Sequence, residues 1–393
     1  MSMKQIVLFE DKHSHYLLPL SYFKHFSELK VGCLTIREKW ERKAYTVSRS
    51  GRHYLTDNSK LNTSDTLWVS GRILPNASFI KQLEELEENS ALVSDNFILA
   101  IRSKDTPELD SAGFLSDSNK QNYTCTTIEK PAMLCYPWDV MSYNHSELEE
   151  DLAYYKFQTK AYVGVHLLNE PNVYIHETAE IQPGVVINAE NGPVVINEHA
   201  KIGANSYLEG PLYLSKKVEV RPFTSVKDSA IHYHCKIGGE ISGSVMYDYS
   251  NKVHHGFLGN SVLGSWTNLG AGTTNSNLKN NYSNVSMMYF NDIIKTDTQF
   301  LGLIFGDHSK AAINTTFNTG TIVGVNTNIF GGGIPPKLVP SFIWGGIDSF
   351  EKYNIDKAKT VAKAVMDRRN IEFDDTVDAL FNNVYQHVLD VEY

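Results

Sequence analysis

The feature that most constrains this 393-residue chain is an aliphatic residue that recurs at every sixth position in its second half. The longest unbroken series has the members Ile196, Ile202, Leu208, Leu214, Val220 and Val226. A period of six matches neither the 3.6-residue period of an α-helix nor the two-residue period of a simple strand. It fits a coil with three flat sides, in which each hexapeptide supplies one short strand and one corner. The second half is therefore predicted to be an all-β, parallel β-helix whose aliphatic residues point inward.

The same period recurs on both sides of this series. Further members are Ile175, Ile181, Ile187, Ile231, Ile237, Leu263 and Leu269. A loop at Asn191-Gly192-Pro193 and a longer insertion around 275–300 interrupt the register. After the repeats, one apolar stripe at helical spacing predicts a C-terminal α-helix that caps or braces the coil. Its members are Leu380, Phe381, Val384, Tyr385, Val388 and Leu389.

The first half has a different pattern, in which short apolar strands alternate with helices. Strands are expected at 4–9, 66–69 and 97–101, and helices at 29–42 and 79–88. This alternation is typical of an α/β layer domain with a mostly parallel sheet. These patterns predict four segments: an α/β domain at 1–145, a connecting helix at 146–160, the β-helix at 161–345 and a helical tail at 346–393.

Composition limits the kind of protein. The apolar fraction of 42% and the charged fraction of 21% are those of a globular protein. No signal peptide or membrane-spanning run is visible, and the four cysteines are scattered as reduced thiols would be, so we expect a cytoplasmic protein. The net charge of −9 argues against a nucleic-acid partner, because a phosphate backbone requires a basic surface.

The stretch 251–279 contains the strongest candidates for catalytic residues. His254 and His255 stand just before Gly256, among several polar residues. A neutral imidazole can take a proton from an amine that attacks a thioester, because its pKa lies near working pH. Nearby glycines allow backbone N–H groups to approach the thioester oxygen as charge develops on it. A lone histidine is more often a surface or packing residue, so the spacing alone does not decide the role.

Several motifs along the chain together resemble one enzyme family. They are Leu17-Leu18-Pro19-Leu20, the 29–40 run LKVGCLTIREKW, Gly71-Arg72-Ile73-Leu74-Pro75, Pro137-Trp138-Asp139, the run 250–254, the run 256–280 and Asn318–Gly324. With these motifs the chain resembles a variant family of the bifunctional N-acetylglucosamine-1-phosphate uridylyltransferase/glucosamine-1-phosphate N-acetyltransferase. The resemblance implies a nucleotidyltransferase-like α/β domain, a left-handed β-helix, a homotrimer and acetyl-CoA as co-substrate. It also implies acetyl transfer to the amine of an amino-sugar phosphate, with coupled nucleotidyl transfer as an option.

The resemblance assigns residues in the β-helix. His254 matches the catalytic base and Arg221 the arginine that holds the sugar phosphate. Asn268, Asn277 and Lys279 match substrate-binding positions, and Ala271, flanked by Gly270 and Gly272, matches the backbone that faces the coenzyme. The chain departs from the family pattern where Phe257 replaces a tyrosine and where a substrate lysine falls near Ser242. These departures leave the acceptor sugar open.

The first domain follows its family less closely. Nucleotidyltransferases begin with a glycine-rich loop that cradles phosphate, whereas residues 9–16 contain no glycine. Arg37, Lys39 and Arg72 are the candidates for nucleotide-sugar binding, with Mg²⁺ as an optional ion. Solvated helix and loop charges explain the same three residues equally well.

Two other functions remain open from the residues alone. One is a zinc enzyme of the carbonic-anhydrase-like β-helix type, with His232, His234 and Cys235, or His254 and His255, as ligands. The preferred interpretation includes no metal in the β-helix. The other is a regulatory subunit that binds nucleotide sugar without turnover, which the unusual first loop favours.

Overall fold

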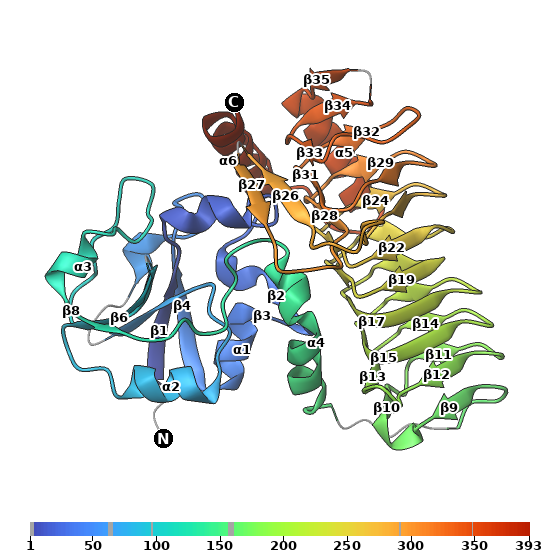
Figure 1. Ribbon diagram of the computed structural model, residues 1–393, viewed down its shortest axis with the longest axis horizontal. Helices are drawn as coiled ribbons and strands as arrows, with labels where there is room; N and C mark the ends of the chain where they lie inside the picture. The colour runs from blue at the N-terminus through green and yellow to red at the C-terminus, as the bar shows by residue number, and fades with distance from the viewer. Residues whose placement is uncertain (1–3, 62–65, 96, 156–160, 291, 348) are drawn as a thin grey trace. The chain divides into compact units, whose positions relative to one another are not determined.

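The chain divides into two units near Asp139. The structure is a computed structural model that describes residues 4–61, 66–95, 97–155, 161–290, 292–347 and 349–393. The first unit runs to Asp139 without Val31–Cys33, and the second contains Val31–Cys33 together with Val140–Tyr393. Figure 1 shows a layered α/β unit and a coil of stacked strands.

The first unit is built on a six-stranded mixed sheet with the order β4-β1-β5-β7-β6-β8. Its strands are β1 (Lys4–Phe9), β4 (Tyr45–Ser50), β5 (Thr66–Ser70), β6 (Ser90–Ser94), β7 (Phe97–Ser103) and β8 (Thr124–Thr127). Its helices are α1 (Ile36–Arg42), α2 (Ala77–Glu84) and α3 (Asn119–Asn122), and the short β2 (Lys30–Val31) and β3 (Leu34–Thr35) precede α1. β1 is parallel to β4 and β5, but β7 is antiparallel to both β5 and β6. The expected strands are confirmed, and because β6 is parallel to β8, three of the five strand pairings are parallel, as the predicted mostly parallel sheet requires.

The helix predicted at 29–42 is wrong in its first half. α1 begins only at Ile36, because Thr35 forms its N-terminal cap. The Thr35 hydroxyl accepts a hydrogen bond from the Glu38 N–H (3.1 Å), and the Glu38 carboxylate accepts one from the Thr35 N–H (2.8 Å). Upstream of the cap, Gly32 has a φ of +70°, which ends any helical path there.

The second unit is the predicted parallel β-helix, of the left-handed type, with three faces. The first face contains β10 (Val173–Ile175), β13 (Val194–Ile196), β15 (Tyr207–Leu214), β17 (Ser225–Ile231), β20 (Val245–Met246), β23 (Val262–Leu263), β28 (Leu303–Phe305), β31 (Thr321–Val323) and β33 (Leu338–Val339). The second face contains β9 (His166–Leu168), β12 (Val186–Asn188), the first parts of β15 and β17, β19 (Glu240–Ser242), β22 (Phe257–Gly259), β25 (Thr274–Asn275) and β30 (Thr316–Phe317). The third face contains β11 (Glu180–Ile181), β14 (Lys201–Ile202), β16 (Glu219–Val220), β18 (Lys236–Ile237), β21 (Asn251–Lys252), β24 (Asn268–Leu269), β29 (Lys310–Ala311), β32 (Asn328–Ile329) and β34 (Ile343–Gly345).

Strand register confirms the hexapeptide repeat. Lys201 pairs with Glu219, and Lys310 pairs with Asn328, so these coils contain 18 residues, six for each face. All six residues of the Ile196–Val226 series are at most 2% exposed and belong to one continuous apolar core. Burial of each such side chain contributes about 1.5–3 kcal/mol to folding, which explains why the period is kept along the chain.

Both predicted interruptions are present. Glu180 pairs with Lys201, an offset of 21 residues that accommodates the 191–193 loop. Val262 pairs with Ile304, an offset of 42 residues, because a β-hairpin is inserted after β25. The hairpin consists of β26 (Ser286–Tyr289) and β27 (Asp292–Lys295).

The connecting and C-terminal helices differ from their predicted bounds. α4 (Asp139–Leu152) begins seven residues before the predicted start at Ser146, whose hydroxyl instead donates to the Tyr143 carbonyl within the helix. Residues 156–160 of the predicted connecting helix lie outside the described residues. The C-terminal tail contains two helices rather than one, α5 (Ile355–Asp367) and α6 (Asp375–Glu392).

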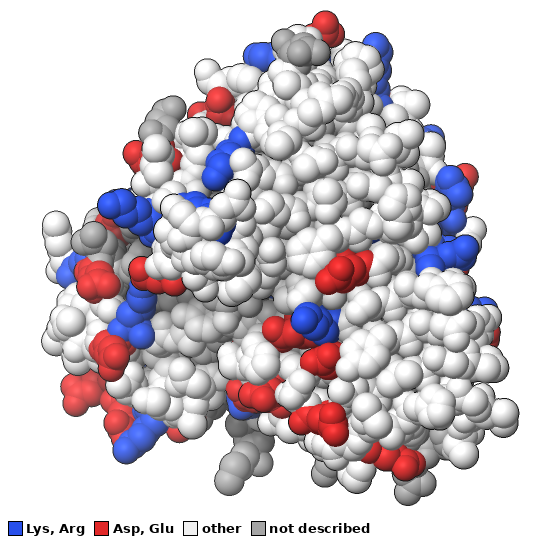
Figure 2. Space-filling view, turned by 45° about the vertical axis from the view of Figure 1, so that its right-hand side comes forward, with Lys and Arg blue, Asp and Glu red and all other residues white. Residues whose placement is uncertain are grey.

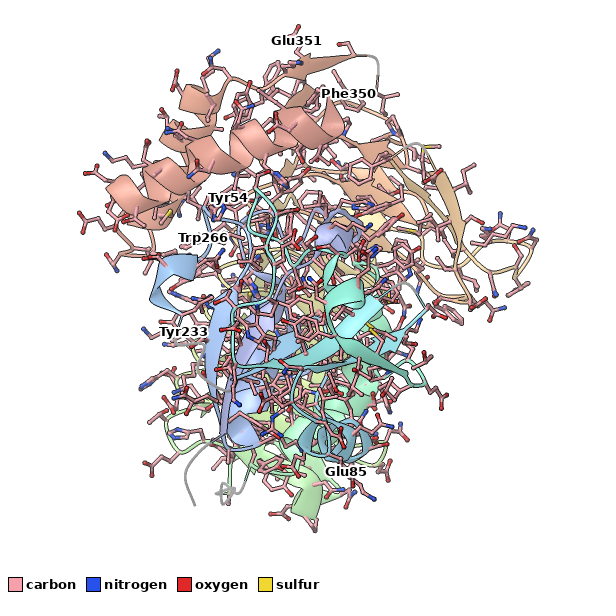
Figure 3. All side chains as sticks on the ribbon, turned by 90° about the vertical axis from the view of Figure 1, so that its left-hand side faces the viewer. Tyr54, Glu85, Tyr233, Trp266, Phe350 and Glu351 are labelled. Carbon is pink, nitrogen blue, oxygen red and sulfur yellow. The ribbon has the colours of Figure 1, made fainter. Side chains whose placement is uncertain are left out.

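The tail helices brace one corner of the coil. The rings of Phe381 and His308 lie 5.0 Å apart, and those of Tyr385 and Phe342 lie 4.9 Å apart. The same corner continues as a column of rings in which Tyr249 stacks on Trp266 at 4.0 Å; Figure 3 labels Trp266. The last strand, β35 (Phe350–Lys352), pairs antiparallel with β34 and ends the third face.

The surface carries charges of both signs. On the face drawn in Figure 2, acidic and basic side chains are interspersed and wide areas carry neither. Within the described ranges, no helix combines the length and apolar character that a membrane crossing requires. The four cysteines are free thiols.

Candidate active site

The corners between the third and second faces have unequal lengths. Arg221–Thr224 and Val253–Gly256 are corners of four residues, but the corner between them contains only Gly238 and Gly239. A Cβ atom on Gly238 would lie 2.0 Å from the Val253 carbonyl oxygen, so a side chain cannot be accommodated there. The short corner therefore lies tightly against the coil that carries His254 and His255.

His255 contacts the corner of the next coil. Its carbonyl accepts a hydrogen bond from the Gly272 N–H (3.1 Å), and its Nε2 lies 3.4 Å from where a Gly272 Cβ would stand. In that corner, Ala271 accepts a hydrogen bond from the Asn314 N–H at 2.7 Å. The Ala271 N–H itself has no hydrogen-bond partner within the described ranges. The fold thus brings an exposed imidazole beside a backbone donor that is free to bind another group.

His254 is also exposed, but its backbone carbonyl accepts a hydrogen bond from a buried lysine of the same coil. Lys252 takes the inward position that Ile237 occupies in the preceding coil and is only 1% exposed. The Lys252 ammonium donates to the carbonyl oxygens of His254 (2.5 Å) and Gly238 (3.1 Å). Burial lowers the pKa of Lys252 to about 8. The sequence period could have revealed this residue, because it is a lysine in a position that the repeat reserves for aliphatic side chains.

Arg221 lies in the same column of corners. Its Cβ stands 3.4 Å from the position of a Gly238 Cβ. Its guanidinium is half exposed, with one contact of 3.5 Å to the Glu219 carboxylate. Such an exposed pair contributes at most about 1 kcal/mol, so the guanidinium can exchange this contact for a phosphate. Asn268, in β24, is likewise exposed.

Asn277 and Lys279 are placed elsewhere. The Asn277 amide donates to the Asn260 side-chain oxygen (2.7 Å), and the Lys279 ammonium donates to the Asn284 carbonyl (2.6 Å). Both residues follow β25, after the chain has crossed the second face, so they lie at the base of the inserted hairpin. The structure does not gather them with His255, Gly270 and Ala271 in one chain.

In the first unit, charged residues follow the parallel strands at their carboxyl ends. Glu10 follows β1 and Arg52 follows β4. The Arg52 guanidinium forms two hydrogen bonds with the Glu10 carboxylate (2.7 and 2.9 Å), and both side chains are at most 2% exposed. Burial by itself raises the pKa of Glu10, but the charges of Arg52 and His25 and the hydrogen bonds from Arg52 together lower this pKa to about 2. The sequence reading missed this pair, because its members stand 42 residues apart.

The three predicted nucleotide-sugar residues lie in different surroundings. Arg37, on α1, donates to Glu28 and Glu41 at 2.7 Å each, and Lys39 on the same helix is buried. Arg72 follows β5, is fully buried, and donates to the Asp11 carboxylate at 2.6 Å. The Nε and Nη1 groups of Arg72 have no acceptor in the described part of the chain. Of the three, only Arg72 presents buried donors that are not already used.

Metal binding receives little support from the described side chains. They contain no cluster of three His, Cys, Asp or Glu residues arranged to hold a metal ion. His232 is 1% exposed and lies between the rings of Tyr213 and Tyr247, and the Cys235 thiol donates to a carbonyl. These contacts favour packing roles over zinc ligation. Glu10 and Asp11 are both engaged by arginines, so they do not form a ready ligand set for Mg²⁺.

Comparisons with known proteins agree with the resemblance read from the motifs. Residues 6–159 match the sugar nucleotidyl transferase family. The chain is 27% identical over 198 residues to the bifunctional protein GlmU of Synechococcus elongatus, covering 45% of this chain and 40% of that relative. It is 32% identical over 200 residues to a bifunctional sugar-1-phosphate nucleotidylyltransferase/acetyltransferase of Sulfurisphaera tokodaii, covering 50% and 44%. Each match thus spans less than half of the relative's length.

Among solved structures, the chain is similar to the polySia specific acetyltransferase NeuO. The TM-score is 0.30 at 16% sequence identity, over 49% of this chain and 87% of that chain. By these sequence matches the chain is similar to a class of transferases named for sugar nucleotidyl transfer and acetyl transfer. Within this class the chain is similar to the bifunctional GlmU proteins, which confirms the resemblance carried by the sequence motifs.

Proposed function

We propose that this protein transfers an acetyl group from acetyl-CoA to the amine of an amino-sugar phosphate resembling glucosamine 1-phosphate. The observation that carries the proposal is the placement of the exposed His255 imidazole against the corner where the Ala271 N–H is unpartnered. A base and an oxyanion donor on adjacent coils are the two groups that acyl transfer requires.

The chemistry follows from these groups. The amine nitrogen attacks the thioester carbonyl carbon, and the imidazole takes the proton that the nitrogen loses. The Ala271 N–H stabilises the charge on the thioester oxygen, with Gly270 and Gly272 leaving room for the pantetheine arm. The carbon–sulfur bond then breaks, the imidazolium gives its proton to the sulfur, and coenzyme A leaves as a thiol. Arg221 and Asn268 hold the phosphate of the sugar.

Either His254 or His255 is the base. The motif comparison favours His254, whereas the contact with Gly272 favours His255. Replacement of each by alanine separates the two. We expect the variant that lacks the base to lose about 10²–10⁴ in kcat with unchanged thermal unfolding, and its neighbour to change by less than tenfold.

The test follows free thiol during incubation of the whole chain with acetyl-CoA and glucosamine 1-phosphate. The protein has an exposed thiol at Cys125, so a reaction without acceptor sugar gives the background. N-acetylglucosamine 1-phosphate, which lacks the amine, is the matched negative acceptor. Absence of thiol release with every amino-sugar phosphate, or full activity in both histidine variants, contradicts the proposal.

Asn277 and Lys279 enter the proposal through assembly. Both lie at the base of the inserted hairpin, away from the His255 corner of their own coil. In a homotrimer of β-helices, which the resemblance implies, they would serve the substrate site of a neighbouring copy. Sedimentation of the whole chain tests this assembly, and a strictly monomeric active enzyme contradicts it. The resemblance also makes cytoplasmic supply of a nucleotide sugar the proposed role.

A second candidate applies to the first unit. Its family match supports nucleotide-sugar recognition, but Glu10 and Asp11 are occupied by Arg52 and Arg72. This pairing favours binding without nucleotidyl transfer, with Arg72 as the residue that contacts phosphate. Release of pyrophosphate from UTP and N-acetylglucosamine 1-phosphate in the presence of Mg²⁺ would contradict binding without turnover.

A further inference from the structure

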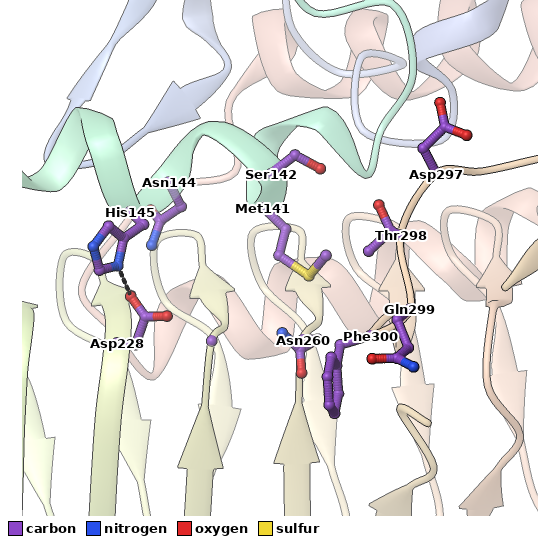
Figure 4. A pocket seen from close by; sticks show the side chains of 11 residues that line it. Met141, Ser142, Asn144, His145, Asp228, Asn260, Asp297, Thr298, Gln299 and Phe300 are labelled. Atoms are coloured by element: carbon purple, nitrogen blue, oxygen red, sulfur yellow. Dashed lines mark hydrogen bonds and ion pairs between the residues drawn. The ribbon is translucent and has the colours of Figure 1, made fainter. Parts of the chain in front are cut away.

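A cavity of about 400 Å³ lies in the second unit between α4, the edge of the second face and the segment before β28. Figure 4 shows its lining: α4 contributes Asn144 and His145 from above, and the coils contribute Asp228 and Asn260 from below. The cavity lies at the opposite end of β22 from the His255 corner, and it is not part of the site described above.

Two amide groups in the cavity are oriented as hydrogen-bond donors. Asn144 is 2% exposed, and its side-chain oxygen accepts from the Gly32 N–H (3.2 Å). The Asn260 side-chain oxygen accepts from the Asn277 amide (2.7 Å). With both oxygens committed, both Nδ2 groups must donate, and neither has an acceptor in the described ranges. Both Nδ2 groups therefore line the cavity as unused donors, which can bind a ligand that supplies oxygen atoms.

Acceptors face the same space. The Gln299 amide nitrogen donates to the Tyr282 carbonyl (2.7 Å), which leaves its side-chain oxygen as an acceptor. Asp228 is bonded to His145 Nδ1 at 2.9 Å, and Asp297 supplies a second carboxylate. No lysine or arginine occurs among the described lining residues. Two carboxylates without a strong cation disfavour a phosphorylated or otherwise anionic ligand.

The cavity also offers apolar surface. Phe300, which is 43% exposed, and Met141 border the polar groups. A ring of hydroxyl groups with one apolar C–H face matches this mixture of donors, acceptors and an aromatic side chain. The volume lies at the small end of ligand pockets, which suits a single sugar ring.

We propose that this cavity is a second ligand site, which binds one hexopyranose ring that carries no phosphate. The Asn144 and Asn260 amides donate to ring hydroxyl or acetamide oxygens, and Asp228, Asp297 and Gln299 accept from hydroxyl or amine groups. This site shares no residue with the His255 corner, and its one link to the acetyl-transfer proposal is the hydrogen bond between Asn260 and Asn277.

Isosteric variants test the site without disturbing the fold. Asn144→Asp and Asn260→Asp keep the oxygen that accepts from Gly32 or Asn277 and replace the NH₂ donor by a carboxylate oxygen; the added negative charge is also introduced by the control variant. Asn188→Asp is the matched control, since Asn188 is a buried asparagine of the same face with both side-chain groups bonded (2.9 and 3.1 Å). N-acetylglucosamine is the probe, and its binding to the whole chain is followed by titration calorimetry and ligand-observed NMR.

We expect each Asn→Asp variant in the cavity to weaken binding at least about tenfold. Asn188→Asp and Arg221→Ala should leave it unchanged. A phosphate at position 1 of the probe should not strengthen binding in an Arg221→Ala background. Absence of binding to the wild-type chain, equal affinity of the cavity variants, or loss of binding on Arg221→Ala would each overturn the proposal. Acetyl-transfer activity is measured separately, so failure of one proposal leaves the other intact.

Discussion

Two regions of the molecule place an arginine within two residues of the end of a strand, and they use it in opposite ways. In the first unit, Arg52 is buried, and its guanidinium donates hydrogen bonds to the Glu10 carboxylate, the Tyr54 hydroxyl and the Lys24 carbonyl. In the β-helix, Arg221 is half exposed and makes one long contact with Glu219. The first arrangement stabilises the fold, and the second leaves a cation available for a ligand.

The difference teaches how a phosphate site should be recognised. Both units contain an arginine after a strand. The local sequence does not distinguish the arginine that stabilises the fold from the arginine that is available to a ligand. The partners that the fold supplies decide the role, because a guanidinium with filled hydrogen bonds in a buried site cannot exchange them cheaply.

The largest effect is expected from Glu10→Gln in the first unit. The change leaves the Arg52 charge buried and unpaired, which should lower the free energy of unfolding by about 3–5 kcal/mol. Denaturant unfolding measures this loss, and Glu219→Gln, next to Arg221, is the matched control with an expected change below about 1 kcal/mol.

Acid sensitivity checks the same pair. Because the pKa of Glu10 is about 2 in the folded state and 4.5 ordinarily, its contribution is complete above pH 4.5 and is lost as the pH falls toward 2. The shift corresponds to roughly 3 kcal/mol. A Glu10→Gln variant with the same acid profile as the wild-type chain would show that Arg52 and Glu10 are not a stabilising pair.

An intermediate effect is expected from Lys252→Met, with Lys310→Met as the control. Both lysines lie on the third face, donate to a carbonyl, and have a pKa that burial lowers to about 8, although Lys310 is partly exposed. Only Lys252 holds the His254 backbone. Lys252→Met should cost about 2 kcal/mol through two unpaired carbonyl groups and lower kcat about tenfold with little change in KM. Lys310→Met should leave acetyl transfer unchanged.

The pH dependence of stability distinguishes the effect of burying a lysine charge from the role of Lys252 in positioning the His254 backbone. The folded state releases each lysine proton at lower pH than the unfolded chain, so stability rises between about pH 8 and 10.5. Each methionine variant should remove a similar part of that rise. Equal loss of kcat in both variants would show that Lys252 has no special relation to the histidine corner.

The smallest effect is expected from Arg221→Ala. Loss of one exposed phosphate contact should raise KM for the amino-sugar phosphate about tenfold, or 1.4 kcal/mol, and leave stability unchanged. Steady-state kinetics at low and high salt measure it, because a phosphate contact weakens with ionic strength. An unchanged KM would place the phosphate elsewhere, and the contrast with Arg52 would then concern stability alone.

The sequence predicted regular elements well and their ends poorly. The strands at 4–9, 66–69 and 97–101 and the β-helix were recovered, because their periods are local properties of the chain. β4, with the sequence YTVSRS, was missed because its exposed polar residues give no apolar run. The start of α1 was displaced because the Thr35–Glu38 cap, rather than the preceding apolar residues, sets the first helical turn.

For the candidate site, the motifs located the correct stretch but not its geometry. The resemblance assigned the catalytic base to His254 and no role to His255, yet His255 is the histidine that contacts Gly272, 17 positions later in the chain. Arg37 and Arg72 were grouped by charge. In the structure Arg37 forms hydrogen bonds with two glutamates, whereas Arg72 is buried and its Nε and Nη1 groups have no acceptor in the described part of the chain. Such differences arise from contacts between coils and between strands, which no local pattern records.

By itself, the sequence determined that the second half must coil with six residues for each face. A repeated aliphatic position can be buried in only one backbone geometry, so the period specifies the architecture. The tertiary structure alone decided which polar groups have no partner among the described residues: the Ala271 N–H beside His255, and the Asn144 and Asn260 Nδ2 groups in the cavity. Hydrogen-bond satisfaction depends on which atoms meet across the fold, and that is settled only when distant segments pack.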